Sequence, residues 1–142
     1  MYRDILLCVD VEDESSWRRA LPTAVEYCRA FGAKLHVLTV VPDFGMSMVA
    51  QYFPGDYEQK VREQAGQRLH RLVRDLVPED VKVQCIVAVG TIYHEIIQAA
   101  ERINADLIVM ASHRPELEDY LIGPNATRVV RHSTRSVLVV RN

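Results

Sequence analysis

The sequence has no long run of apolar residues, which argues against a protein that spans a membrane. Every apolar stretch is too short to cross the hydrocarbon core of a bilayer. The first stretch, residues 5–9, is also too short and too closely flanked by acidic residues to be the hydrophobic part of a secretory signal. We therefore expect no membrane partner.

Neither sign of charge dominates, and cysteine is scarce. The chain has 17 Lys and Arg against 19 Asp and Glu, a net charge of −2, which disfavours nucleic acid as a partner. Its three cysteines, Cys8, Cys28 and Cys85, stand far apart without the spacing of a metal site. We interpret them as reduced thiols in the core of a cytoplasmic protein.

The common signatures of catalysis are missing as well. The chain has no glycine-rich loop ending in lysine and no serine on a nucleophile elbow. Its five histidines lack the spacing of metal ligands. We expect a protein that is not an enzyme and has no protein-built metal site, with slow ATP hydrolysis as a weaker alternative.

What the sequence does have is a regular alternation of strand-like and helix-like segments. Strands are predicted over residues 5–9, 35–41, 81–87, 106–110 and 136–140, and helices over 17–31, 57–76, 92–103 and 123–132. Such alternation predicts an α/β domain, with a five-stranded parallel sheet and helices on both faces. We expect a single domain over residues 1–142, but hydrophobicity does not determine the order of the strands.

Local signals refine these elements. Pro22 either kinks the first helix or marks its true start, and Ser15 or Asp13 can cap that helix. Thr91 can cap the third helix. Apolar and polar residues alternate over 81–87, which places this strand at or near an edge of the sheet.

Two further segments suggest interactions. Residues 43–56 carry Gly and Pro signals and read as a mobile loop, either a lid or a docking surface. The last strand, 136–140, is too apolar for an exposed edge, which would risk aggregation. Pairing with a second copy across a two-fold axis would cover it, so we expect a homodimer through the C-terminal strand.

The most informative feature is the stretch 109–114 together with residues 121–126. An apolar run ends in Ala111, Ser112, His113 and Arg114, and a short loop leads to Gly123-Pro124-Asn125-Ala126, which can open a helix. A helix amino terminus presents unpaired N–H groups and partial positive charge, and therefore holds phosphate well. The crevice beyond the ends of parallel strands is also where ligands bind. The pattern predicts a ligand that carries phosphate.

Several blocks resemble the universal stress protein family over essentially the whole chain. They are Val9-Asp10, residues 38–42, Val89-Gly90, residues 104–114 and residues 129–141. The resemblance implies a Rossmann-like five-stranded sheet, and dimerisation through the last strand. In the nucleotide-binding branch of that family, the motif is Gly, two residues, Gly, nine residues, then Gly-Ser or Gly-Thr.

This chain departs from that motif. Ala111 and Arg114 stand at the first two glycines, eight residues separate Arg114 from Gly123, and Pro124 replaces the hydroxyl residue. The Ser-His-Arg-Pro variant with its shortened loop resembles a subgroup that is still associated with adenine nucleotides. Arg114 offers phosphate a bidentate cation, whereas Pro124 removes one N–H. The expected result is an anion cradle with fewer backbone donors and one more charge.

By the same resemblance, adenine and ribose lie near Asp10, Val40 or Val41, and Gly90. Each residue also has a plainer interpretation. Asp10 can cap its own loop, Ser112 can make a local turn bond, and Arg114 can be a solvated charge. For His113 we favour a packed loop histidine over a catalytic role.

We therefore expect an adenine-nucleotide-binding stress protein that takes ATP or AMP, with or without Mg²⁺. The acidic run of Asp10, Glu12, Asp13 and Glu14 can hold Mg²⁺ beside a nucleotide, but a solvated helix start is the commoner role for such a run. The alternative function is a nucleotide-independent interaction protein of the same fold.

Overall fold

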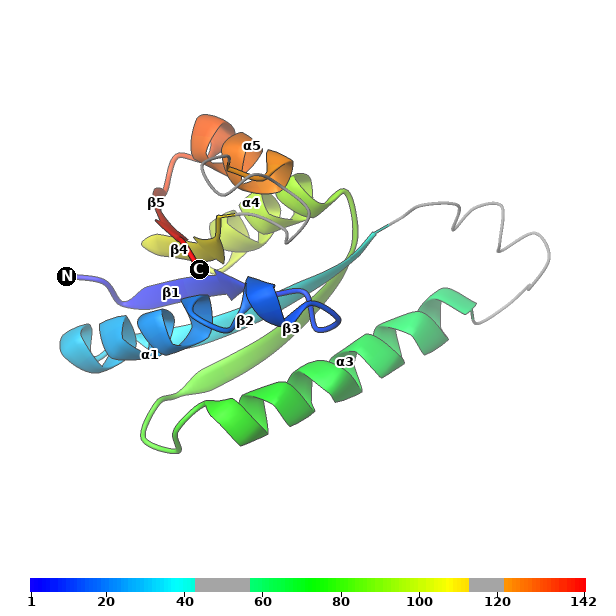
Figure 1. Ribbon diagram of the computed structural model, residues 1–142, viewed down its shortest axis with the longest axis horizontal. Helices are drawn as coiled ribbons and strands as arrows, with labels where there is room; N and C mark the ends of the chain where they lie inside the picture. The colour runs from blue at the N-terminus through cyan, green and yellow to red at the C-terminus, as the bar shows by residue number, and fades with distance from the viewer. Residues whose placement is uncertain (43–56, 113–121) are drawn as a thin grey trace.

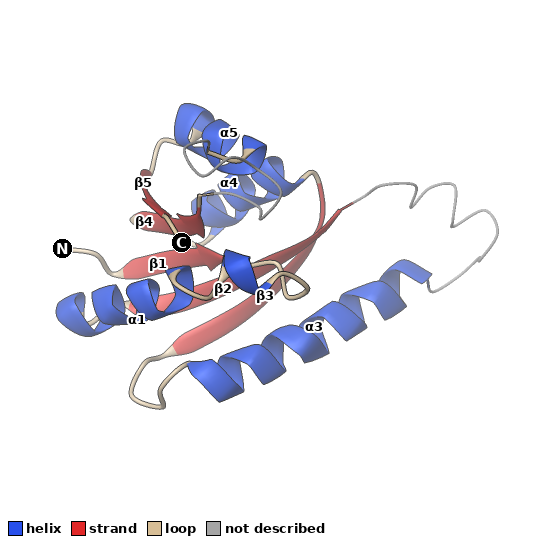
Figure 2. Ribbon diagram, in the orientation of Figure 1, coloured by secondary structure: helices blue, strands red, loops and turns tan. Residues whose placement is uncertain are grey.

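The computed structural model describes residues 1–42, 57–112 and 122–142, and these contain one five-stranded parallel sheet. Its strands are β1 (Asp4–Cys8), β2 (Lys34–Pro42), β3 (Val83–Gly90), β4 (Leu107–Ala111) and β5 (Ser136–Val140). Every neighbouring pair runs parallel. The predicted α/β fold class is confirmed, as Figures 1 and 2 show.

The strands lie in the order β3-β2-β1-β4-β5, which the hydrophobic pattern had left open. The chain builds outward from β1 to β3 and then returns to place β4 against the other side of β1. The direction of winding therefore reverses between β1 and β4. In open α/β sheets, the crevice outside such a reversal is the usual place for a ligand.

Helices cover both faces of the sheet (Figure 2). One face packs against α1 (Ala20–Phe31) and α3 (Tyr57–Leu76), and the other against α4 (Ile92–Arg102) and α5 (Pro124–His132). Alternate residues of β1 divide between the two cores: Ile5 and Leu7 join the first, and Leu6 and Cys8 the second. This alternation follows from the two-residue period of a strand.

The first helix begins later than its apolar pattern suggested. A single 3₁₀ turn, η1 (Glu14–Ser16), comes first, and α1 starts at Ala20. Pro22 is the third residue of α1, within the first turn, so it marks the start of the helix and does not lie in its interior. The predicted cap was wrong in its target: Asp13 accepts from the Ser15 N–H and caps η1, whereas α1 begins without a side-chain cap bond.

Other local expectations had mixed outcomes. β3 is an edge strand, as predicted, and β5 forms the opposite edge. Thr91 stands at the amino terminus of α4 but makes no side-chain cap bond. On α3, Ala65, Leu69 and Val73 are buried, whereas Leu76 is exposed at the helix end. The predicted loop 43–56 lies outside the described residues.

Candidate functional site

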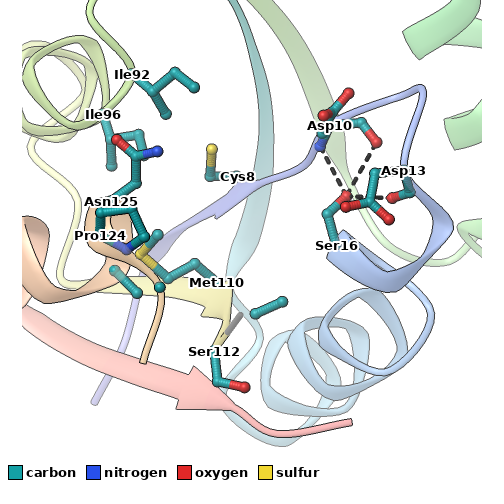
Figure 3. A pocket seen from close by; sticks show the side chains of 13 residues that line it. Cys8, Asp10, Asp13, Ser16, Ile92, Ile96, Met110, Ser112, Pro124 and Asn125 are labelled. Atoms are coloured by element: carbon teal, nitrogen blue, oxygen red, sulfur yellow. Dashed lines mark hydrogen bonds between the residues drawn. The ribbon is translucent and has the colours of Figure 1, made fainter. Parts of the chain in front are cut away.

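A pocket opens at the carboxyl ends of β1 and β4, where the winding reverses (Figure 3). Four segments that are distant in sequence line it. They contribute Cys8, Asp10, Asp13 and Ser16 from β1 and the following turn; Ile92 and Ile96 from α4; Met110, Ala111 and Ser112 from β4 and its end; and Gly123, Pro124, Asn125 and Ala126 from α5. In Figure 3 the acidic turn lies opposite the two helices, with Cys8 between them.

The acidic wall is a turn that its own hydrogen bonds hold in place. The Ser16 hydroxyl accepts from the Asp10 N–H at 2.8 Å and lies 2.7 Å from the Asp13 carbonyl oxygen, to which it donates. Asp10 Oδ1 accepts from the Glu12 N–H at 3.0 Å. The loop-capping interpretation of Asp10 is therefore confirmed, and the same residue also lines the pocket.

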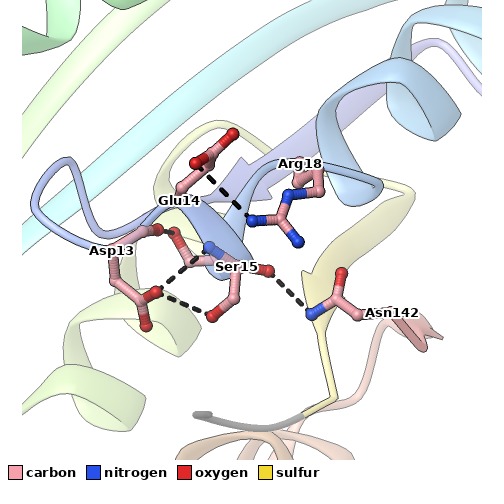
Figure 4. A network of polar contacts seen from close by, with 6 residues as sticks. Asp13, Glu14, Ser15, Arg18 and Asn142 are labelled. Carbon is pink, nitrogen blue, oxygen red and sulfur yellow. Dashed lines mark hydrogen bonds and ion pairs between the residues drawn. The ribbon is translucent and has the colours of Figure 1, made fainter.

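Asn142, which follows β5, forms a hydrogen bond with this turn (Figure 4). The Asn142 side chain donates from Nδ2 to the Ser15 carbonyl oxygen at 2.9 Å, and Asp13 Oδ1 accepts from both the Ser15 N–H and its hydroxyl. The position of Asp13 in the pocket is thus set by its neighbours in sequence and by the segment after β5.

The acidic run divides between different partners. Glu12 forms an ion pair with Arg68 on α3, and Glu14 pairs with Arg18 at 3.5 Å. Within the part of the chain that the structure describes, no three His, Cys, Asp or Glu side chains come together as a metal site.

The opposite wall is the amino terminus of α5. Gly123 is its N-cap, and the Gly123 N–H donates to the Ser112 carbonyl oxygen. Pro124 occupies the first helical turn, and the Thr127 N–H donates to the Gly123 carbonyl oxygen at 3.0 Å. The end of β4 and the start of α5 are thus joined by backbone hydrogen bonds, and the positive end of the helix faces the pocket.

Ser112 is the most enclosed polar residue of the site, with no exposed surface. Its N–H donates to the Val140 carbonyl oxygen at 2.9 Å and its own carbonyl oxygen accepts from Gly123. The backbone of Ser112 therefore links β5 to α5.

The floor between the walls is apolar and carries two sulfur atoms. Cys8 and Met110 come from adjacent strands, and Ile92 and Ile96 approach from α4. Burial, with a smaller contribution from the negative charge of Asp10, raises the pKa of the Cys8 thiol to about 12. The thiol therefore stays protonated at neutral pH and serves as a small apolar surface.

Three residues proposed for adenosine lie apart from this lining. Val41 pairs with Val89, and Pro42 with Gly90, at the carboxyl ends of β2 and β3. Val40 packs in the same core cluster as Cys8, on the face that carries the pocket. Gly90 has φ +152°, a backbone conformation that residues with a side chain rarely adopt, so this position favours glycine.

Of the predicted site residues, Asp10, Ala111, Ser112 and residues 123–126 line one pocket. His113 and Arg114 lie outside the described residues. Sequence reasoning missed Cys8, Ser16, Ile92, Ile96 and Met110 as lining residues. Finding them would have required the order of the strands, because the pairing of β1 with β4 brings these side chains to one place.

Comparison with known proteins agrees with this architecture. The Universal stress protein family matches residues 1–141. The chain belongs to that family. Universal stress protein G of Escherichia coli O157:H7 is 30% identical over 144 residues, spanning 99% of this chain and 100% of that protein.

Solved structures of relatives share the fold. That of MJ0577, from Methanocaldococcus jannaschii, superimposes with a TM-score of 0.77 at 28% identity, covering 100% of this chain and 97% of its own. A universal stress protein in complex with cAMP gives 0.65 at 21% identity, covering 99% and 97%. One from Archaeoglobus fulgidus in complex with dAMP gives 0.62 at 18%, covering 99% and 98%.

No helix in the described ranges combines the length and apolarity needed to cross a bilayer.

Proposed function

We propose that this universal stress protein binds an adenine nucleotide in the pocket between β1, β4, α4 and α5, and acts as a binding module without catalytic turnover. The observation that carries the proposal is the meeting of a helix amino terminus with a pocket at the winding reversal of the sheet. Two relatives of the same fold are complexes with cAMP and dAMP, which supports adenine nucleotides as the ligand class.

The pocket offers a partner for each part of such a ligand. The amino terminus of α5 suits phosphate, and the carboxylates of Asp10 and Asp13 suit hydroxyl or amine donors. The apolar floor around Cys8 and Met110 suits the flat face of a base or sugar. The candidate ligands are ATP and AMP, with or without Mg²⁺. We also propose a cytoplasmic location, which the unpaired cysteines favour.

The direct test is to identify what the protein carries. Protein purified without added nucleotide is denatured, and the released small molecules are identified by mass spectrometry. Stripped protein is then titrated calorimetrically with AMP, ADP and ATP. We expect a stoichiometric adenine nucleotide or micromolar binding. An empty protein that binds none of the three would support the alternative, a nucleotide-independent interaction protein.

A substitution localises the binding. Gly123→Val places a branched side chain where phosphate would approach α5, and we expect a loss of affinity of at least about tenfold. The control is Gly66→Ala on α3, where a Cβ meets only Val87 at an ordinary 3.7 Å. Equal nucleotide affinities in the two variants would show that the ligand does not bind at the amino terminus of α5.

We also propose that two copies pair through β5. This strand is a sheet edge, and its four apolar residues, 137–140, are only partly buried. An apolar edge with unpaired backbone groups is a template for another strand. Light scattering after size-exclusion chromatography should give twice the mass of the chain at micromolar concentration. A monomer under those conditions contradicts the pairing.

A further inference from the structure

A groove of about 580 Å³ opens where β1, β2 and β3 begin, and we call it the amino-end groove. Its lining comes from the carboxyl end of α1, the loop between α3 and β3, and the starts of β1 and β2. The two gaps in the described chain begin after Pro42 and Ser112, at the carboxyl ends of β2 and β4. From Tyr57, where the description resumes, the 20 residues of α3 lead about 30 Å to the loop of the groove. The groove is therefore built from described residues.

Positive charge dominates the lining of the amino-end groove. Among the described residues, the charged side chains that line it are Arg3, Arg29, Lys34, Asp80 and Lys82. Arg29 and Asp80 neutralise each other, because Arg29 donates to both carboxylate oxygens of Asp80, at 3.1 and 3.0 Å. The charges of Arg3, Lys34 and Lys82 remain.

The backbone holds these three cations on neighbouring strands. The Lys34 N–H donates to the Arg3 carbonyl oxygen at 2.9 Å, and the Leu35 N–H donates to the Lys82 carbonyl oxygen at 2.8 Å. Because neighbouring strands lie about 4.8 Å apart, the three backbones fall within about 10 Å. The side chains are exposed, and none of them takes part in an ion pair within the described ranges. An anion placed among them relieves their mutual repulsion.

Two further carboxylates lie near the start of β1, and each has another partner. Asp4 Oδ1 lies 2.9 Å from His36 Nε2. Asp106 Oδ2 accepts from the backbone N–H of Arg3 at 2.6 Å. Neither residue is part of the groove lining. These carboxylates therefore hold the start of β1 in place, while the Arg3 side chain reaches the groove.

The groove suits a compact ligand that carries several negative charges. Its volume lies within the range of small-molecule sites. A lysine ammonium binds phosphate as a point charge, and an arginine guanidinium presents a fork of donors that matches two phosphate oxygens. A long polyanion would extend beyond the groove over a chain of net charge −2, which repels it. Several phosphate groups in one small molecule match both the charge and the space.

We propose that the amino-end groove binds a small molecule with two or more phosphate groups, at a site separate from the pocket between β1, β4, α4 and α5. Arg3, Lys34 and Lys82 contact the phosphates. The pair of Arg29 and Asp80 holds the carboxyl end of α1 against the loop that carries Lys82.

The test uses tripolyphosphate as the probe and inorganic monophosphate as its comparison. Both are titrated calorimetrically at constant ionic strength, with and without excess AMP. We expect tripolyphosphate to bind saturably, at least about tenfold more tightly than monophosphate, and independently of AMP. Absence of saturable binding, or displacement of tripolyphosphate by AMP, overturns the inference.

A double variant localises the site. Lys34→Gln combined with Lys82→Gln should weaken tripolyphosphate binding by at least about tenfold, because two charge-assisted contacts are lost. The matched control is Arg71→Gln combined with Arg131→Gln, which removes the same charge from exposed positions on α3 and α5. The control should keep the wild-type affinity. Equal affinities in the two double variants refute the site.

Urea unfolding separates ligand binding from a purely structural role. A ligand that binds the folded state stabilises it, so tripolyphosphate should raise the urea midpoint of wild type and of the control, but not of the groove variant. Cations can also serve only to balance the partial negative charge at the carboxyl end of α1. In that case tripolyphosphate will shift the midpoints of wild type and the groove variant equally, and the proposal is wrong.

Discussion

The two ends of the sheet use polar side chains in opposite ways. At the amino end, the His36 side chain is buried, with Nε2 lying 2.9 Å from Asp4 Oδ1 and Nδ1 2.7 Å from Gln84 Oε1. His36, on the middle one of three adjacent strands, thus contacts a residue on each neighbouring strand. At the carboxyl end, Asp10, Asp13 and the start of α5 surround a hollow.

The difference teaches what each end is built for. Polar groups that pair with one another inside a protein stabilise it and define the register of its strands, because an unpaired buried group is costly. Polar groups that converge on a pocket leave part of their hydrogen-bonding capacity for a ligand. The His36 network is thus expected to affect stability alone, and the carboxyl end chiefly binding.

The largest effect should come from breaking the amino-end network. His36→Leu replaces the imidazole with an apolar side chain of similar size and removes both hydrogen bonds, leaving Asp4 and Gln84 without this partner. We expect the free energy of unfolding, measured in urea, to fall by about 2 kcal/mol. Nucleotide affinity should stay unchanged.

The matched control is His70→Leu, because His70 is exposed on α3. Its unfolding free energy should change by no more than about 0.5 kcal/mol. A fall in nucleotide affinity in His36→Leu would show that the two ends are coupled, and the separation drawn above would be wrong.

A smaller effect, confined to binding, is expected at the carboxyl end. Asp10→Asn retains the Oδ1 acceptor that holds the Glu12 N–H but loses the negative charge. Because hydrogen bonds to a charged acceptor are about twice as strong as neutral ones, AMP affinity should fall about tenfold in calorimetric titration. Asp75→Asn, on the exposed side of α3, is the control. Loss of stability without loss of affinity would make Asp10 purely a loop cap.

Much of this fold could be predicted from the sequence because buried strands and amphipathic helices leave local patterns. The apolar run at residues 5–9 became β1 and the run at 136–140 became β5, each within one residue of the predicted bounds. Helix starts were harder to predict. Asp13 carries a cap signal, but a signal of that kind does not say whether a 3₁₀ turn or a full helix follows.

The residues of the site also fall into those that the local sequence could predict and those that it could not. Residues 111–112 and 123–126 could be predicted because they form a continuous motif around a strand end and a helix start. Cys8 and Ile92 could not, because they reach the pocket only through the adjacency of β1 and β4 and the crossing of α4. That adjacency is a long-range property, and apolar periodicity contains no information about it.

The smallest expected effect returns to the amino-end half of the molecule, at a surface ion pair between α1 and the loop after α3. Arg29 donates from Nε to Asp80 Oδ2 at 3.1 Å and from Nη2 to Oδ1 at 3.0 Å. This hydrogen bonding, together with the charge of Arg29, lowers the pKa of Asp80 below its ordinary value of 3.8. Both side chains are exposed, so solvent screens the pair strongly.

The sign of the pH dependence follows from that direction. The folded protein holds the Asp80 carboxylate ionised to lower pH than the unfolded chain does, so the pair stabilises the fold above about pH 4. That contribution disappears as the pH falls through the lowered pKa of the folded state. Between pH 7 and pH 2, the free energy of unfolding in urea should therefore fall slightly less for Asp80→Asn than for wild type. Added salt should reduce this difference between the two proteins. Identical pH profiles would mean that this pair, unlike the buried His36 network, contributes nothing to the amino end.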